Sequence, residues 1–97
     1  MTDPMTLDAI RASIDAVDAD LVRLLARREA LVRQAAPLKR DAQAVQAPGR
    51  VEQVIARARE QAGAAGADPD VVERIYRAMV QAYIDLELGV HLSLIHI

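Results

Sequence analysis

The first forty residues carry an apolar pattern that indicates one long amphipathic helix. From position 7 to about position 44, apolar side chains recur at steps of three and four residues: Leu7, Ile10, Ile14, Val17, Leu21, Leu24, Leu31 and Leu38. This spacing places them on one helix face. Thr6 can cap the helix, and Asp8 puts a negative charge in its first turn, where the helix dipole favours it. Pro37 interrupts the pattern, so we expect a kink just before Lys39.

Three cations occupy the same stripe as these apolar residues. Arg11, Arg28 and Lys39 fall at the same three-and-four spacing. Burying positive charge costs free energy unless an opposite charge pairs with it, and the sequence places no run of acidic residues to neutralise all three. A single arginine on such a stripe is more commonly a flanking residue whose charge reaches water. The set of three favours a small polyanionic ligand.

Two further helices are predicted, and no strand pattern is present. The VQAPG sequence at 45–49 indicates a loop, because its Pro–Gly pair disfavours helix. A shorter helix follows, and the GAAG stretch at 63–66 ends it. Asp68 then caps a third helix with Pro69 at its first position. We expect the side chains of this third helix that face the core to be Val72, Ile75, Tyr76, Met79, Val80, Tyr83 and Leu86. We expect an all-α fold of three helices: long, short and medium.

The length of the first helix predicts a dimer. A helix from position 7 to 44 would span about 55 Å, whereas a compact globule of this chain length has a diameter of roughly 32 Å. Two shorter helices cannot cover it, so we expect an intertwined helical homodimer. Arg11 lies about 25 Å from Arg28 along the helix. In a dimer of antiparallel long helices it would instead reach the partner's site.

Composition excludes several classes of function. The net charge is −2 with acids and bases interspersed, so we expect neither nucleic acid nor membrane as a partner. No cysteine is present, which excludes disulfides and thiolate chemistry. Glu87 and His91 are four residues apart and could share a metal ion, but no second metal motif accompanies them, so we expect no metal. The first six residues do not resemble a secretory signal, which favours the cytoplasm.

The last six residues differ from everything before them. The string LSLIHI at 92–97 resembles the translation of a common sequencing-adapter repeat. We therefore expect one domain over residues 1–91, and a non-native tail over 92–97.

Several segments together resemble the all-helical chorismate mutases. The resemblance rests on I-R-x-x-I-D-x-x-D at 10–18, L-x-x-L-L-A-x-R at 21–28, Lys39, Arg50 and the segment 76–87. It implies an intertwined helical dimer with two sites, each completed by an arginine from the other protomer. It also implies the rearrangement of chorismate to prephenate in aromatic amino-acid biosynthesis, an isomerase reaction without cofactor or covalent intermediate.

The resemblance assigns roles to the cations. Arg28 and the partner's Arg11 would bind the two substrate carboxylates, which arginine can do with two parallel hydrogen bonds. Lys39 would bridge a carboxylate and the ether oxygen, where negative charge develops as the carbon–oxygen bond breaks. Arg50 would support the site from the second helix.

Glu87 would be the second donor to the ether oxygen. Many relatives carry Gln at this position, a permanent donor, whereas Glu donates only when protonated. We therefore expect activity to fall as the pH rises toward neutrality and above. Tyr83 takes the position of a small polar residue of the family; it is a candidate substrate-binding residue, although core packing is its expected main role.

Two positions leave alternatives open. Ala47 and Val51 are apolar where the family usually has acidic residues that engage the substrate's ring hydroxyl. The A-P-x-R-V loop at 47–51 instead resembles the isochorismate pyruvate lyases of salicylate formation, which share this fold. We favour the mutase, with the lyase second and a non-catalytic helical dimerisation module third.

Overall fold

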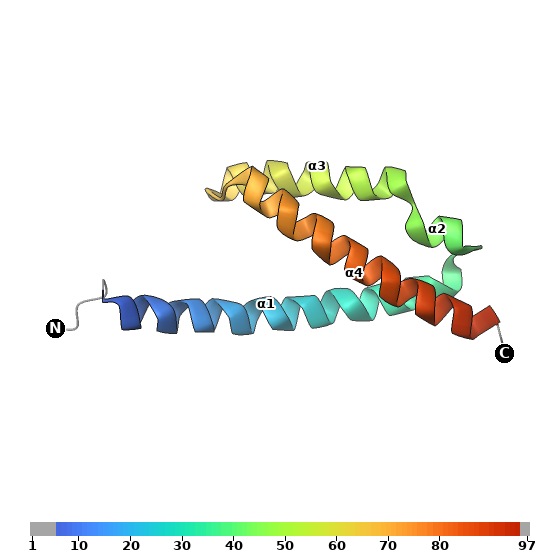
Figure 1. Cartoon of the computed structure of the whole chain (residues 1–97), viewed down its shortest axis with the longest axis horizontal. Coiled ribbons are helices and arrows are strands. Elements are labelled where there is room, and N and C mark those ends of the chain that lie inside the picture. Colours follow the sequence, from blue (N-terminus) through green and yellow to red (C-terminus); the bar gives the residue numbers. More distant parts are fainter. Residues whose placement is uncertain (1–5, 96–97) are drawn as a thin grey trace. The chain divides into compact units, whose positions relative to one another are not determined.

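The computed structural model describes the backbone of residues 6–95 and the side chains of residues 6–93. Over this range the chain is all-helical, which confirms the predicted all-α class, whereas the predicted dimer stays a prediction. Its elements are α1 (Leu7–Ala35), a 3₁₀ turn η1 (Ala36–Leu38), α2 (Ala42–Gln46), α3 (Pro48–Ala65) and α4 (Pro69–Ile95) (Figure 1). The N-terminal segment 1–5 and positions 96–97 of the predicted tail lie outside the described residues. Across the described part, no helix offers an apolar stretch long enough to cross a bilayer.

The chain divides into two units between Leu31 and Val32. The first unit contains most of α1, and its start follows the prediction. The Thr6 hydroxyl accepts a hydrogen bond from the Ala9 N–H at 3.1 Å, which is the expected N-terminal cap. In the single chain α1 has no buried residue. Its large apolar side chains are exposed: Leu7, Ile10, Ile14, Val17, Leu21, Val22, Leu24, Leu25 and Leu31.

The second unit has its core between α3 and α4, with η1 and α2 packed on α4. Among the residues whose side chains are described, the buried apolar ones all lie in this unit: Ala36, Val45, Ile55, Ala58, Ala62 and Val80. The turn between α3 and α4 forms as predicted. Gly66 has a φ of 83°, and the Ala67 N–H donates to the Ala62 carbonyl at 2.8 Å, which closes α3. Asp68 caps α4, accepting from the Asp70 N–H at 2.8 Å.

Pro37 ends the first helix instead of kinking it, so the prediction of a helix to position 44 is wrong. Proline has no N–H and its ring clashes with the preceding helical turn. The helix therefore stops at Ala35, and a 3₁₀ turn follows in which the Lys39 N–H donates to the Ala36 carbonyl at 3.3 Å. Lys39 itself is extended, with φ −92° and ψ 137°. It does not belong to the α1 stripe.

The predicted loop at 45–49 is also wrong, because most of it is helical. The Asp41 carboxylate caps α2 by accepting from the Ala44 N–H at 2.8 Å. Pro48 occupies the first position of α3, where its missing N–H is no loss. Only Ala47 lies between the two helices. It takes the left-handed conformation, with φ 33° and ψ 65°, as the C-terminal cap of α2, and its N–H donates to the Gln43 carbonyl at 3.0 Å.

The last helix is longer than predicted. It has 27 residues against 29 in α1, so the description as a medium helix is wrong. Most of the expected inward residues are buried or half-buried, namely Val72, Tyr76, Met79, Val80, Tyr83 and Leu86. Ile75 is the exception at 59% exposed. It lies one turn after the exposed Val71, on a face of α4 that α3 does not cover.

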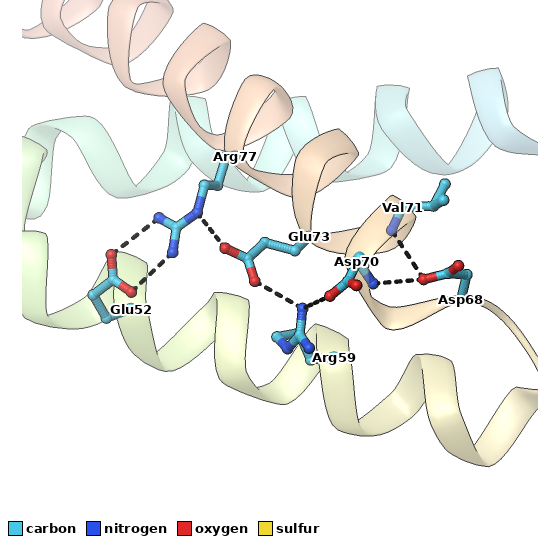
Figure 2. A network of polar contacts seen from close by, with 7 residues as sticks. All are labelled: Glu52, Arg59, Asp68, Asp70, Val71, Glu73 and Arg77. Atoms are coloured by element: carbon cyan, nitrogen blue, oxygen red, sulfur yellow. Dashed lines mark hydrogen bonds and ion pairs between the residues drawn. The ribbon is translucent and has the colours of Figure 1, made fainter.

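A chain of ion pairs fixes α3 against α4 (Figure 2). Arg77 donates to both carboxylate oxygens of Glu52 at 3.0 and 3.2 Å and to Glu73 at 2.7 Å. Arg59 reaches Glu73 and Asp70, each at 2.9 Å. Hydrogen bonds from Arg77 lower the pKa of Glu52 and of Glu73, and the Asp70 carboxylate raises the pKa of Arg59. The pairs set how α3 lies along α4, and α4 carries Glu87.

Candidate active site

Two of the predicted catalytic residues meet in the second unit. The Lys39 ammonium lies 2.8 Å from Glu87 Oε1. The two side chains come from different elements, since Lys39 follows η1 and Glu87 lies in α4. Their environments differ, because the Glu87 side chain is 6% exposed and that of Lys39 is 30% exposed. The ion pair therefore has a buried carboxyl group, that of Glu87, and a partly exposed ammonium group, that of Lys39.

The buried oxygen of Glu87 has unused hydrogen-bonding capacity. Oε1 is shielded from solvent, and none of the described residues gives it a well-directed hydrogen bond. The Lys39 ammonium lies within ion-pairing distance of this atom, but the angle between the two groups does not meet the geometry of a hydrogen bond. Leaving a buried polar atom without a hydrogen bond is costly and uncommon. A group that enters here can improve the hydrogen bonding of Glu87.

His91 extends this cluster by one helical turn. Its ring is buried, and Nδ1 lies 3.2 Å from the Ala36 carbonyl oxygen. A carbonyl only accepts hydrogen bonds, so Nδ1 carries the hydrogen. From the sequence, His91 could be recognised only as a possible metal ligand, and this contact could not be predicted. The available signal was its spacing four residues after Glu87, which places both on one face of α4. Within the described part of the chain, no group of three His, Cys, Asp or Glu side chains is arranged so that it could hold a metal ion.

Two other predicted residues lie in the same unit. Tyr83 is half-buried, one turn before Glu87 on α4. Arg50 is exposed in the first turn of α3, and its Nη1 donates to Gln53 Oε1 at 2.8 Å, along its own helix. A ligand that recruited Arg50 would have to compete with this hydrogen bond. The roles predicted for both residues in substrate binding stay predictions.

The remaining predicted cations, Arg11 and Arg28, belong to the first unit. Arg11 is exposed on α1, whereas Arg28 is half-buried. Both stand on one continuous helix, about 25 Å apart along its axis. One small ligand cannot span that distance within a single helix. Their contribution to a site with Lys39 and Glu87 stays a prediction.

A hollow of about 550 Å³ lies within the second unit. Its apolar wall includes Val51 and Ile84, and its polar rim includes the Glu52–Arg77 ion pair. The volume falls in the range of small-molecule pockets. The hollow is lined by ten residues: Gln46, Pro48, Val51, Glu52, Arg77, Val80, Gln81, Ile84, Asp85 and Leu88. Lys39 and Glu87 are not among these residues, so the hollow and the Lys39–Glu87 ion pair are separate features of the second unit.

The sequence also matches one known protein family. The family model for chorismate mutase type II matches residues 10–88, about four fifths of the chain. The chain belongs to this family, which confirms the resemblance seen in the sequence. The matched range contains every predicted site residue, from Arg11 to Glu87, and ends before His91. No curated protein matches the chain. Membership supports a chorismate mutase-type enzyme that acts on a small molecule.

Proposed function

We propose that this protein is a chorismate mutase, which rearranges chorismate to prephenate for aromatic amino-acid biosynthesis. The observation that carries the proposal is the contact between Lys39 and the buried Glu87, at 2.8 Å, in a chain of this family. The reaction breaks one carbon–oxygen bond and forms one carbon–carbon bond within a single molecule. It needs no nucleophile, only a compact substrate conformer and donors at the ether oxygen.

Lys39 and Glu87 supply those donors in the proposed mechanism. In the free protein the ammonium neutralises the carboxylate. When the substrate binds, Lys39 turns to the ether oxygen, and Glu87 takes up a proton so that it can donate to the same atom. The substrate's two negative charges favour that proton uptake. Arg28 and the partner's Arg11 hold the carboxylates. Arg50 and Tyr83 line the substrate from α3 and α4.

A second copy of the chain completes the site in this proposal. The apolar face of α1 is exposed along its whole length in the single chain. Burying apolar surface is worth about 25 cal/mol per Å², so a face of this size favours association. An isologous homodimer pairs α1 with its symmetry mate and brings Arg11 to the other protomer's ligand.

A direct assay tests the activity. Purified protein is mixed with chorismate, and the loss of chorismate absorbance is followed together with prephenate formation. We expect catalysed loss in the wild type and at least a hundredfold lower rate in Lys39→Met, since one charge-stabilising donor is worth about 10²–10³ in rate. Arg57→Gln, which removes an exposed charge on α3, is the matched control and should stay active. Wild-type protein that leaves chorismate at its background rate of decay would refute the proposal and leave the dimerisation module.

The isochorismate pyruvate lyase is the second candidate function. It is favoured by Ala47 and Val51, which offer no carboxylate to a ring hydroxyl. Incubation with isochorismate and detection of pyruvate and salicylate distinguishes the two enzymes. We expect the mutase reaction to be faster. Faster release of pyruvate from isochorismate than prephenate formation from chorismate would assign the protein to the lyases.

A further inference from the structure

One backbone carbonyl ties Lys39 to α4. The Ala36 oxygen accepts the Lys39 N–H at 3.3 Å and the His91 Nδ1–H at 3.2 Å. Ala36 is fully buried, whereas the two residues between it and Lys39 are exposed. The 3₁₀ turn has only three residues, so it has little rigidity of its own. Its buried anchor is the carbonyl that His91 holds.

We propose that His91 is a positioning residue for Lys39, an inference that rests on the proposed mutase function. The imidazole holds the Ala36 carbonyl in place, that carbonyl fixes the Lys39 backbone, and the ammonium is thereby kept at Glu87. His91 and Glu87 are one turn apart on α4, so a single rigid helix carries both the anchor and the acid. Lys39 would otherwise follow a mobile connection, because Pro37 has removed it from α1.

The burial of His91 supports this role over simple packing. A buried imidazole needs hydrogen-bonding partners, and the Ala36 carbonyl supplies one to Nδ1. An apolar residue would fill the same space without holding the carbonyl. Packing alone therefore predicts that a leucine suffices, whereas positioning requires a donor at the place of Nδ1.

Three variants separate the two roles. In Asn the amide nitrogen is as many bonds from Cα as Nδ1, in Gln it is one bond further, and in Leu there is no donor. With chorismate we expect kcat to fall about tenfold in His91→Leu, because one hydrogen bond is lost. His91→Asn should recover most of the loss and His91→Gln less, with KM changing little. If His91→Leu does not fold, the difference between Asn and Gln decides. Equal impairment of Asn and Gln would overturn the proposal, as would a fully active His91→Leu.

A second readout does not depend on catalysis. Lys39 is the only lysine in the sequence, so its acetylation by acetic anhydride can be followed by peptide mass spectrometry. We expect His91→Leu to acetylate several-fold faster than wild type and His91→Asn to return toward the wild-type rate. If the wild type shows no mutase activity while this pattern holds, the proposed function fails and the positioning role stands. If the wild type is active and the acetylation rate of Lys39 is the same in all His91 variants, the positioning role fails.

The state of the ring provides a third observation. Two-bond ¹H–¹⁵N correlation spectra distinguish a hydrogen on Nδ1 from one on Nε2, and the His91 signal is assigned by its loss in His91→Asn. We expect the neutral ring to carry its hydrogen on Nδ1. A neutral ring with Nδ1 unprotonated could not donate to the Ala36 carbonyl and would overturn the proposal.

Discussion

At the scale of single residues, the proposed chemistry depends on the buried carboxyl of Glu87. Its Oε1 is near a cation but lacks a well-directed hydrogen bond. A carboxylate in that position accepts, and only the protonated acid donates. In the proposed reaction the ether oxygen needs a donor, so proton uptake by Glu87 becomes part of catalysis. Gln at the same position donates at any pH.

The pH dependence of the rate tests this role of Glu87. We expect wild-type activity to fall with rising pH, because only the protonated acid can donate to the ether oxygen. Glu87→Gln should show a flat profile over the same range. Initial rates of chorismate loss between about pH 5 and about pH 8 provide the measurement. A flat wild-type profile would contradict the role given to the acid.

At the scale of elements, the breaks between helices decide where the site residues lie. Pro37 and Pro48 are both visible in the sequence, but their effects depend on the residues around them. Pro37 falls late in a long helix and ends it, whereas Pro48 begins one. Ala47 absorbs the change of direction between α2 and α3 in a left-handed conformation, which is strained for a residue with a Cβ atom.

Ala47→Gly should therefore stabilise the protein. Glycine adopts a φ of 33° without steric cost, so we expect a gain of about 0.5–1 kcal/mol in the free energy of unfolding. The matched control is Ala56→Gly within α3, which should lose about 1 kcal/mol. Urea unfolding of both variants gives the two values. A loss at position 47 equal to that at position 56 would show that Ala47 is not strained.

The ion pairs between α3 and α4 predict acid sensitivity. The pKa values of Glu52 and Glu73 are lowered from 4.5 in the folded state, so their contribution to stability is present above that value. It is lost as the pH falls through the lowered pKa values. We expect Arg77→Gln to be less stable than wild type near neutral pH and to match it in strong acid. The midpoints of urea unfolding, measured for both proteins near neutral pH and in strong acid, give the difference in stability.

Arg74→Gln is the control for that experiment, since it removes an exposed charge from the same helix. Its stability should stay close to wild type at both pH values. If the Arg77→Gln difference were as large in acid as at neutral pH, the pairs would not be the source of the stabilisation.

The elements also show what the sequence can predict. The starts and ends with a local cause were predictable, such as the Thr6 and Asp68 caps and the Gly66 turn. The end of α1 at Ala35 was not, because a proline in a helix either kinks or ends it according to tertiary packing. Lys39 and Glu87 could be named from the family pattern. The same pattern implied that they lie near one oxygen, but their direct ion pair and the His91 contact could not be predicted, because both join segments distant in sequence.

At the scale of the whole molecule, the exposed apolar face of α1 requires an explanation. Nine large apolar side chains on one helix are uncovered in the single chain. Monomeric proteins seldom expose contiguous apolar surface of this extent. The proposed homodimer covers it and places the partner's Arg11 at the substrate. Activity and association are therefore linked.

Substitution on this face should separate the protomers. Leu21→Glu places a charge in the centre of the apolar face of α1. We expect it to lower both the molecular mass determined by sedimentation and the chorismate mutase activity. Ala16→Glu is the control, since it lies on the opposite side of α1 and is exposed. Sedimentation at micromolar protein concentration gives the mass of each variant, and the chorismate assay gives its activity. A Leu21→Glu protein with unchanged mass would exclude this face as the interface.

The most direct test of the account mixes two inactive variants. Arg11→Ala lacks the residue supplied to the partner, and Lys39→Met lacks the donor within the protomer. When equal amounts are allowed to exchange protomers, half of the dimers are mixed and each mixed dimer holds one intact site. We predict recovery of about a quarter of wild-type chorismate mutase activity. Two variants that are each inactive and show no recovery after proven exchange would contradict a site shared between two copies.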